Sequence, residues 1–176
     1  MALGSGDALA AENRVANNDM LPKQQGVGIL GVGRSYVESA TRLEAVAAGN
    51  TDIMFPRYYL FCHGIELTLK AFLVSKGTTD RSLRGIGHDL EAALAACRAY
   101  SDFPALSAVE EEVLVWINAY YSVKEFEYLF TGFKSLPNFT NVRELALGLA
   151  DRLEPLVHTA ARQEAITEQR GAQAAP

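Results

Sequence analysis

Cysteine and histidine are scarce in this sequence, with two and three copies among 176 residues. Cys62 and Cys97 lie within apolar helical patterns and are too few for a disulfide framework or a metal cluster, so we expect small buried side chains in a reducing compartment. His63, His88 and His158 do not fall at zinc-ligand spacing with cysteine or carboxylate, and no Glu-x-x-His pair is present for a di-metal bundle. We therefore expect neither a metal nor a cofactor.

Long hydrophobic runs and an excess of basic charge are also missing. No segment approaches about 18 continuous apolar residues, and the N-terminus lacks the basic start and apolar run of a signal peptide, which predicts a cytoplasmic protein without a membrane span. The net charge of −5 and the pI of about 5.2 argue against a protein that grips nucleic acid through a large basic surface. A small local binding site is compatible with this charge.

The apolar content of the chain, 49%, suffices for one domain with a substantial core. Residues 1–25 are polar, have no apolar period and predict a disordered N-terminal arm. Residues 26–162 carry the helical patterns and form the predicted bundle. Residues 163–176 form a polar C-terminal tail.

A glycine-rich stretch opens the first helical pattern. Gly26, Gly28 and Gly31 fit the spacing G-x-G-x-x-G of a dinucleotide-binding loop, but no strand-like run precedes them and no parallel-sheet pattern follows. We therefore interpret this stretch as the beginning of the first helix, where small residues let another backbone come close.

Five segments show helical periodicity and are joined mostly by short links. Their expected bounds are residues 29–48, 56–77, 88–100, 107–123 and 141 to about 162. Asn141 and Glu144 predict a capping box for the last helix, and Pro155 predicts a kink or a lost hydrogen bond within it. Before that helix, the sequence around Thr131-Gly132 predicts a short hairpin or irregular excursion. The predicted fold class is all-α, an up-and-down, mainly antiparallel bundle of about five helices.

The segment 56–77 is the one around which the rest of the chain is organised. Its apolar side chains point in nearly every direction, which is typical of a helix covered on several sides. His63, Glu66 and Lys70 lie along one face of this helix, because they are three and four residues apart. Ionisable groups on a central helix cost desolvation energy unless they are paired or solvated. This stripe therefore marks either a structural network, with Glu66 and Lys70 as an i,i+4 ion pair, or a ligand-binding site.

His88 is a second candidate, at the start of the third predicted helix. It either caps this helix or acts as a catalytic base, with Arg81 or Arg84 of the preceding loop as the cation beside a phosphate.

The third candidate region is the aromatic stretch after the fourth predicted helix, which contains Tyr121, Lys124 and Tyr128. We favour packing for its rings, because few basic residues accompany them. The alternative is a stacking platform that binds bases.

In combination these motifs resemble the HEPN family (higher eukaryote and prokaryote nucleotide-binding domains). The resemblance rests on HGIELTLKAFL at 63–73, on GHDL at 87–90 and on YYSVKEFEYLF at 120–130, and covers roughly residues 31–157. It implies a helical bundle that dimerises and takes part in nucleotide or RNA transactions, often in toxin–antitoxin, defence or stress systems. It also implies a partner protein such as a nucleotidyltransferase-like antitoxin.

The sequence departs from the family pattern in two places. Glu127 precedes Tyr128 where the family has arginine, which replaces a phosphate-binding charge with a repelling one. Ribonuclease members carry an arginine and a histidine separated by four to six residues, and this spacing singles out no histidine here. Three pairs fit it: Arg57–His63, Arg81–His88 and Arg152–His158.

Three hypotheses follow. The leading one is a dimeric, HEPN-like binding or regulatory module for RNA, a nucleotide or a partner protein. The second is a metal-independent endoribonuclease, in which a histidine transfers a proton and an arginine stabilises the phosphorane charge. The third is a scaffold without a ligand, in which the polar groups of 56–77 are structural. We also predict a symmetric homodimer, because few charges interrupt the first two helices.

Overall fold

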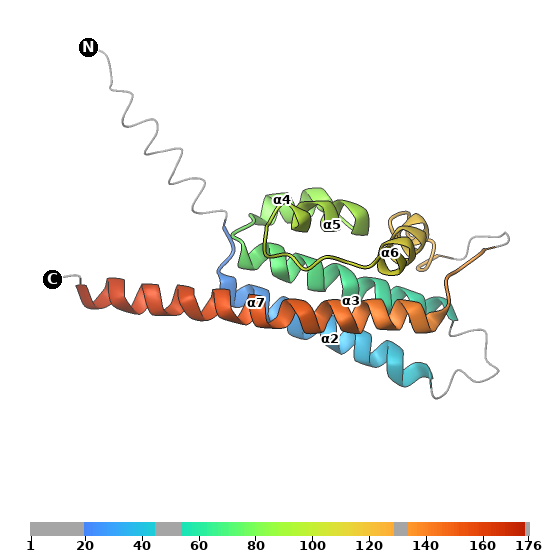
Figure 1. Ribbon diagram of the computed structural model, residues 1–176, viewed down its shortest axis with the longest axis horizontal. Coiled ribbons are helices and arrows are strands. Elements are labelled where there is room, and N and C mark those ends of the chain that lie inside the picture. The colour runs from blue at the N-terminus through green and yellow to red at the C-terminus, as the bar shows by residue number, and fades with distance from the viewer. Residues whose placement is uncertain (1–19, 45–53, 129–133, 175–176) are drawn as a thin grey trace, which may run out of the picture.

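The computed structural model describes residues 20–44, 54–128 and 134–174, and the described residues form six helices (Figure 1). The helices are α2 (Lys23–Glu44), α3 (Met54–Ser75), α4 (Asp80–Ile86), α5 (Leu90–Arg98), α6 (Ala108–Tyr121) and α7 (Phe139–Ala174). The only strand-like pairing among the described residues is one isolated bridge between Met20 and Thr79. The predicted all-α bundle is confirmed, whereas the predicted arm, up to residue 19, and the excursion around Thr131-Gly132 lie outside the described residues.

Helix α3 is the centre of the bundle and contacts α2, α5, α6 and α7. Its rings and aliphatic side chains are fully buried on several sides, including Phe61, Ile65, Leu69 and Phe72. The apolar pattern around the whole axis therefore predicted its central position correctly.

The three long helices run in two directions (Figure 1). Helix α2 is antiparallel to α7, because Lys23 at its start contacts Glu164 and Arg34 at its middle contacts Asp151. Helices α3 and α7 run in the same direction, because Tyr58 near the start of α3 stacks on Phe139 at the start of α7. Between α3 and α7, the segment that contains α4 to α6 returns the chain to the end of the bundle where α3 begins. The predicted antiparallel arrangement is therefore found between α2 and α3 and between α2 and α7, whereas α3 and α7 are parallel.

Glycines set the spacing between α2 and α3. A Cβ atom on Gly33 would lie 3.1 Å from the carbonyl oxygen of Gly64, and one on Gly26 would lie 3.0 Å from that of Ala71. Cβ atoms on Gly28 and Gly31 would meet nothing within 4 Å. The glycine-rich stretch is thus part of a helix and not a dinucleotide-binding loop, and close approach explains Gly26 but neither Gly28 nor Gly31.

Several helix bounds differ from those expected. Helix α2 begins at Lys23, before the expected residue 29. The expected loop after α3 contains α4, because the Thr79 hydroxyl accepts a hydrogen bond from the Ser82 amide and caps a short helix there. Helix α7 begins at Phe139, because Asn138 rather than Asn141 accepts a hydrogen bond from a first-turn amide.

Helix α7 also extends beyond the expected end near residue 162 and reaches Ala174 (Figure 1). The residues from 163 onward are rich in Ala, Glu, Gln and Arg, which favour helix even where little apolar surface is buried. Pro155 lies inside α7 without ending it, although proline cannot donate to the carbonyl of Asp151. Among the described helices, none has the combined length and apolarity needed to cross a membrane.

We predict that Gly64→Ala destabilises the fold by about 1–3 kcal/mol, the usual effect of overpacking. The added methyl group would lie 2.5 Å from Cγ2 of Val37 and 3.0 Å from the carbonyl oxygen of Gly33. The matched control is Gly31→Ala, which meets open space and should stabilise α2 by up to about 1 kcal/mol through helix propensity. Urea unfolding measures both variants, and equal effects would contradict the close packing of α2 on α3.

Candidate functional site

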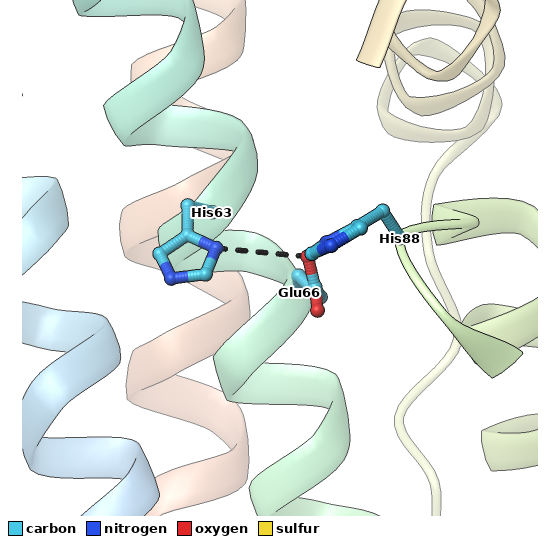
Figure 2. Close-up of side chains that lie close together, drawn as sticks. All are labelled: His63, Glu66 and His88. Atoms are coloured by element: carbon cyan, nitrogen blue, oxygen red, sulfur yellow. Dashed lines mark hydrogen bonds and ion pairs between the residues drawn. The ribbon is translucent and has the colours of Figure 1, made fainter. Parts of the chain in front are cut away.

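A polar cluster interrupts the apolar surface of α3, and we call it the Glu66 cluster. It consists of His63, Glu66 and Lys70 from α3, His88 from the turn before α5, and Tyr121 from the last turn of α6. Figure 2 shows the two imidazole rings on either side of the Glu66 carboxylate. The predicted stripe on α3 therefore supplies three of the five residues of the cluster, and the turn before α5 and the end of α6 supply the other two.

Both carboxylate oxygens of Glu66 accept hydrogen bonds. Oε1 accepts from Nζ of Lys70 at 2.6 Å. Oε2 accepts from the Tyr121 hydroxyl at 2.5 Å and from Nδ1 of His88 at 2.9 Å. Nδ1 of His63 lies 3.6 Å from the same oxygen. A carboxylate that is 3% exposed is thus surrounded by donors from three elements, which is the arrangement that a buried charge requires.

These bonds define the proton positions in the cluster. The single hydroxyl proton of Tyr121 goes to Glu66, so the Tyr121 oxygen accepts from Nδ1 of His63, 3.0 Å away. His88 donates through the same ring nitrogen, Nδ1, to Glu66. In the neutral tautomer both rings therefore keep Nε2 as an acceptor on the side away from the carboxylate.

Burial and hydrogen bonding shift two pKa values in opposite directions. Burial alone would raise the pKa of Glu66, but the adjacent His63 imidazole and the hydrogen bonds from Lys70, Tyr121 and His88 outweigh it and hold this pKa well below its usual value. Burial, followed by the adjacent Glu66 carboxylate, raises the pKa of Tyr121 far above its usual value. Glu66 is therefore an anion and Tyr121 a hydroxyl donor at neutral pH.

The turn that carries His88 is attached to α3 and α6. Lys70 also donates to the carbonyl oxygen of Gly87 at 2.7 Å, and Gly87 has a φ of 61°, a conformation that glycine adopts without strain. On the other side, Asn118 of α6 accepts from the amide of Leu90 at 2.8 Å and donates to Asp89, the N-cap of α5. These bonds place His88 beside the carboxylate. A buried asparagine among the apolar positions of α6 was the sequence signal for this anchor.

Two tyrosine rings flank His63. Tyr59 stacks on it, with ring planes 8° apart and centroids separated by 5.7 Å, and Tyr36 of α2 contacts it edge-on at 4.6 Å. Sequence analysis missed both rings, although Tyr59 precedes His63 by one helical turn. Solvent reaches the cluster mainly at His88, whose side chain is 42% exposed, against 19% for His63.

The structure does not bring every predicted site residue to this cluster. Lys124 and Tyr128 are exposed beyond the end of α6, and no described contact joins them to Glu66. Arg84 pairs with Asp80 on its own helix at 2.7 Å, and Arg81 is exposed one turn earlier on α4. No described contact joins Arg84 to His88.

The two arginine–histidine pairs within helices are also separate. Arg57 is buried over the Phe139 ring and lies 3.9 Å from Glu44. Arg152 pairs with Glu110 at 2.7 Å. Each arginine thus has its partners away from the histidine that follows it in the sequence.

His63, Glu66 and His88 each offer a potential metal ligand, and the three ligand atoms lie within 4.8 Å of one another. The spacing argument overlooked this group, because His88 reaches α3 through the turn before α5 and not through a sequence motif.

Comparisons of the chain with family models, curated proteins and solved structures found no match. The function of this site is therefore inferred from its own geometry.

We predict that Lys70→Met lowers the free energy of unfolding by about 3 kcal/mol or more, because it leaves the buried Glu66 carboxylate without its ammonium partner. The double variant Glu66→Gln/Lys70→Met should recover part of this loss. The matched control is Arg42→Met, which breaks an exposed i,i+4 pair with Glu38 and should cost at most about 0.5 kcal/mol. Equal unfolding midpoints for Lys70→Met and Arg42→Met would show that the Glu66–Lys70 pair is merely solvated.

Proposed function

We propose that the protein is a HEPN-like, homodimeric binding or regulatory module that takes a phosphate-bearing ligand, RNA or a nucleotide, at the open side of the Glu66 cluster. The observation that carries this proposal is the arrangement of two imidazoles on one buried carboxylate, with His88 open to solvent. The resemblance of the stripe on α3 and of GHDL to the family adds to it.

The cluster has the chemistry to hold such a ligand. Glu66 neutralises Lys70 and holds the Nδ1 side of His88, so a phosphate can approach the Nε2 side, which donates a hydrogen bond to it when the ring is an imidazolium. Tyr59 and Tyr36 beside His63 supply aromatic surface, on which a base can stack. The polar and aromatic parts of the cluster thus match the two parts of a nucleotide.

The second candidate function is a metal-independent endoribonuclease. A carboxylate that orients an imidazole through Nδ1 is an arrangement that supports a general base at Nε2, and Glu66–His88 has it. Cleavage also needs a cation beside the scissile phosphate. Glu127 stands where the family resemblance would place an arginine, and Arg57 and Arg152 have their partners away from His63 and His158, which favours binding over cleavage.

We predict weak, salt-sensitive binding of a fluorescently labelled single-stranded RNA in the presence of EDTA, without detectable cleavage. His88→Ala should weaken binding by about tenfold, the loss of one charge-assisted hydrogen bond. The control is His158→Ala on α7, whose side chain is also 42% exposed. Fluorescence anisotropy measures binding, and denaturing gels measure cleavage.

Three outcomes would contradict this proposal. Absence of binding, or equal losses in both histidine variants, would favour a ligand-free scaffold. Robust cleavage that is abolished by His88→Ala and by Arg81→Ala, but not by Glu127→Ala, would favour the endoribonuclease.

The homodimer is supported by an uncovered apolar face on α6, which lies on the side of α3 away from α2 (Figure 1). Its large side chains are 38–59% exposed: Val109, Val115 and Trp116, with Val123 just beyond the helix at 57%. Glu112 lies within this face, one turn from both Val109 and Val115, and Lys124 lies just beyond its C-terminal end, so antiparallel pairing of two copies would bring opposite charges toward each other. The same surface could instead receive the partner protein that the family resemblance implies.

We predict that the protein is a dimer at micromolar concentration and that Val115→Glu weakens dimerisation by more than about tenfold, because it places an unpaired charge in the interface. The matched control is Val32→Glu on α2, since the two valines are 49% and 50% exposed. Light scattering over a dilution series measures both. A monomeric wild type would contradict the predicted dimer. Dissociation by Val32→Glu but not by Val115→Glu would show that the interface lies on α2 and not on α6.

A further inference from the structure

The Glu66 cluster contains ligand atoms of the kinds and at the separations that a transition metal requires. Nδ1 of His88 lies 2.9 Å from Oε2 of Glu66, and Nδ1 of His63 lies 3.6 Å from it. Ligands at zinc bond lengths of about 2.0–2.1 Å in a tetrahedron are about 3.3 Å apart. The two separations from Oε2 lie on either side of this value, and all three ligand atoms lie within 4.8 Å of one another, so movements of the two imidazole side chains would bring all three atoms to bonding distance.

We propose that His63, Glu66 and His88 form a binding site for a divalent transition-metal ion, with Zn²⁺ as the best fit. Two imidazole nitrogens and one carboxylate oxygen suit zinc and its first-row neighbours, whereas Mg²⁺ and Ca²⁺ prefer oxygen ligands. The site goes beyond the proposed binding of RNA or a nucleotide and does not depend on it.

Binding requires a rearrangement of protons that the cluster can make. The ion takes the place of the Nδ1 protons of His63 and His88, and each neutral ring moves its proton to Nε2. Oε2 of Glu66 exchanges the hydrogen bond from His88 for a bond to the ion. Tyr121 keeps its hydroxyl proton and its hydrogen bond to Glu66. No proton is released from neutral rings, and no redox step is involved.

The surroundings of Glu66 favour binding through one oxygen. Lys70 holds Oε1 at 2.6 Å, so Oε2 alone is available to the ion. Hydrogen bonds of this kind orient metal-binding carboxylates, although the ammonium charge opposes a nearby cation and makes the site weaker than a four-ligand structural zinc site. His88 is the mobile part, because it follows Gly87 in a turn and its side chain is 42% exposed.

Three protein ligands leave a fourth position for water, which can reach the site at the half-exposed side chain of His88. Three protein ligands with one open position are typical of zinc sites that exchange their fourth ligand, whereas structural sites are closed. The geometry thus predicts a site that binds and releases metal with the rest of the fold in place.

The test is calorimetric titration of Zn²⁺ into chelator-treated full-length protein. We expect one ion per chain, with affinity lowered by more than about tenfold in His63→Ala and in His88→Ala. His158→Ala is the matched control, because this exposed histidine lies 3.7 Å from Glu154 on α7 and would report adventitious binding at the surface. Its affinity should equal that of the wild type. Visible absorption of the Co²⁺ form, strong for four-coordinate and weak for six-coordinate cobalt, provides a second readout.

The folded state of each variant is checked by its melting curve in EDTA, and replacement of the half-exposed His88 should leave it folded. Absence of saturable Zn²⁺ binding in the wild type would overturn the proposal. Equal losses in His88→Ala and His158→Ala would overturn it as well, since the binding would then be superficial. RNA binding is measured in EDTA, so failure of one proposal leaves the other standing.

Discussion

The burial of the Glu66 carboxylate is the constraint on which the rest of the structure depends. A negative charge on the central helix is tolerated only when donors surround it, and no single helix supplies enough of them. Lys70 comes from the same helix, His88 from the turn before α5 and Tyr121 from the end of α6. Three elements must therefore meet at one point, which fixes the position of α5 and α6 on α3 more specifically than apolar contact would.

On its other side, α3 packs closely against α2 through glycine residues. Helix α2 approaches so closely that Gly33 and Gly64 face each other without side chains between them. This contact brings Tyr36 of α2 within reach of the His63 ring. The close helix packing and the polar cluster are thus connected through one histidine, which contacts α2 on one side and the Tyr121 hydroxyl on the other.

Local patterns in the sequence predicted the features that depend on one helix. The central position of α3 and the common face of His63, Glu66 and Lys70 follow from helical periodicity, and both are observed. The partners from other elements could not be predicted in the same way, because Tyr121 lies 55 residues from Glu66 and its role depends on the rotation of α6. For the same reason the sequence grouped Tyr121 with Tyr128 in one candidate region, whereas in the structure Tyr121 belongs to the cluster and Tyr128 is 61% exposed and has no described contact with it.

The Glu66 cluster can have both a structural and a functional role, because its residues differ in their exposure to solvent. Side-chain exposure is 3% for Glu66, 15% for Lys70, 19% for His63 and 42% for His88. The inner pair lies in a low local dielectric, so its interaction stabilises the fold, while Oε2 of Glu66 faces the imidazoles. Nδ1 of His88 is held by Glu66 and Nδ1 of His63 by the Tyr121 hydroxyl, so both outer imidazoles have defined orientations. A binding site built in this way has its orientation fixed by the same hydrogen bonds that stabilise the bundle.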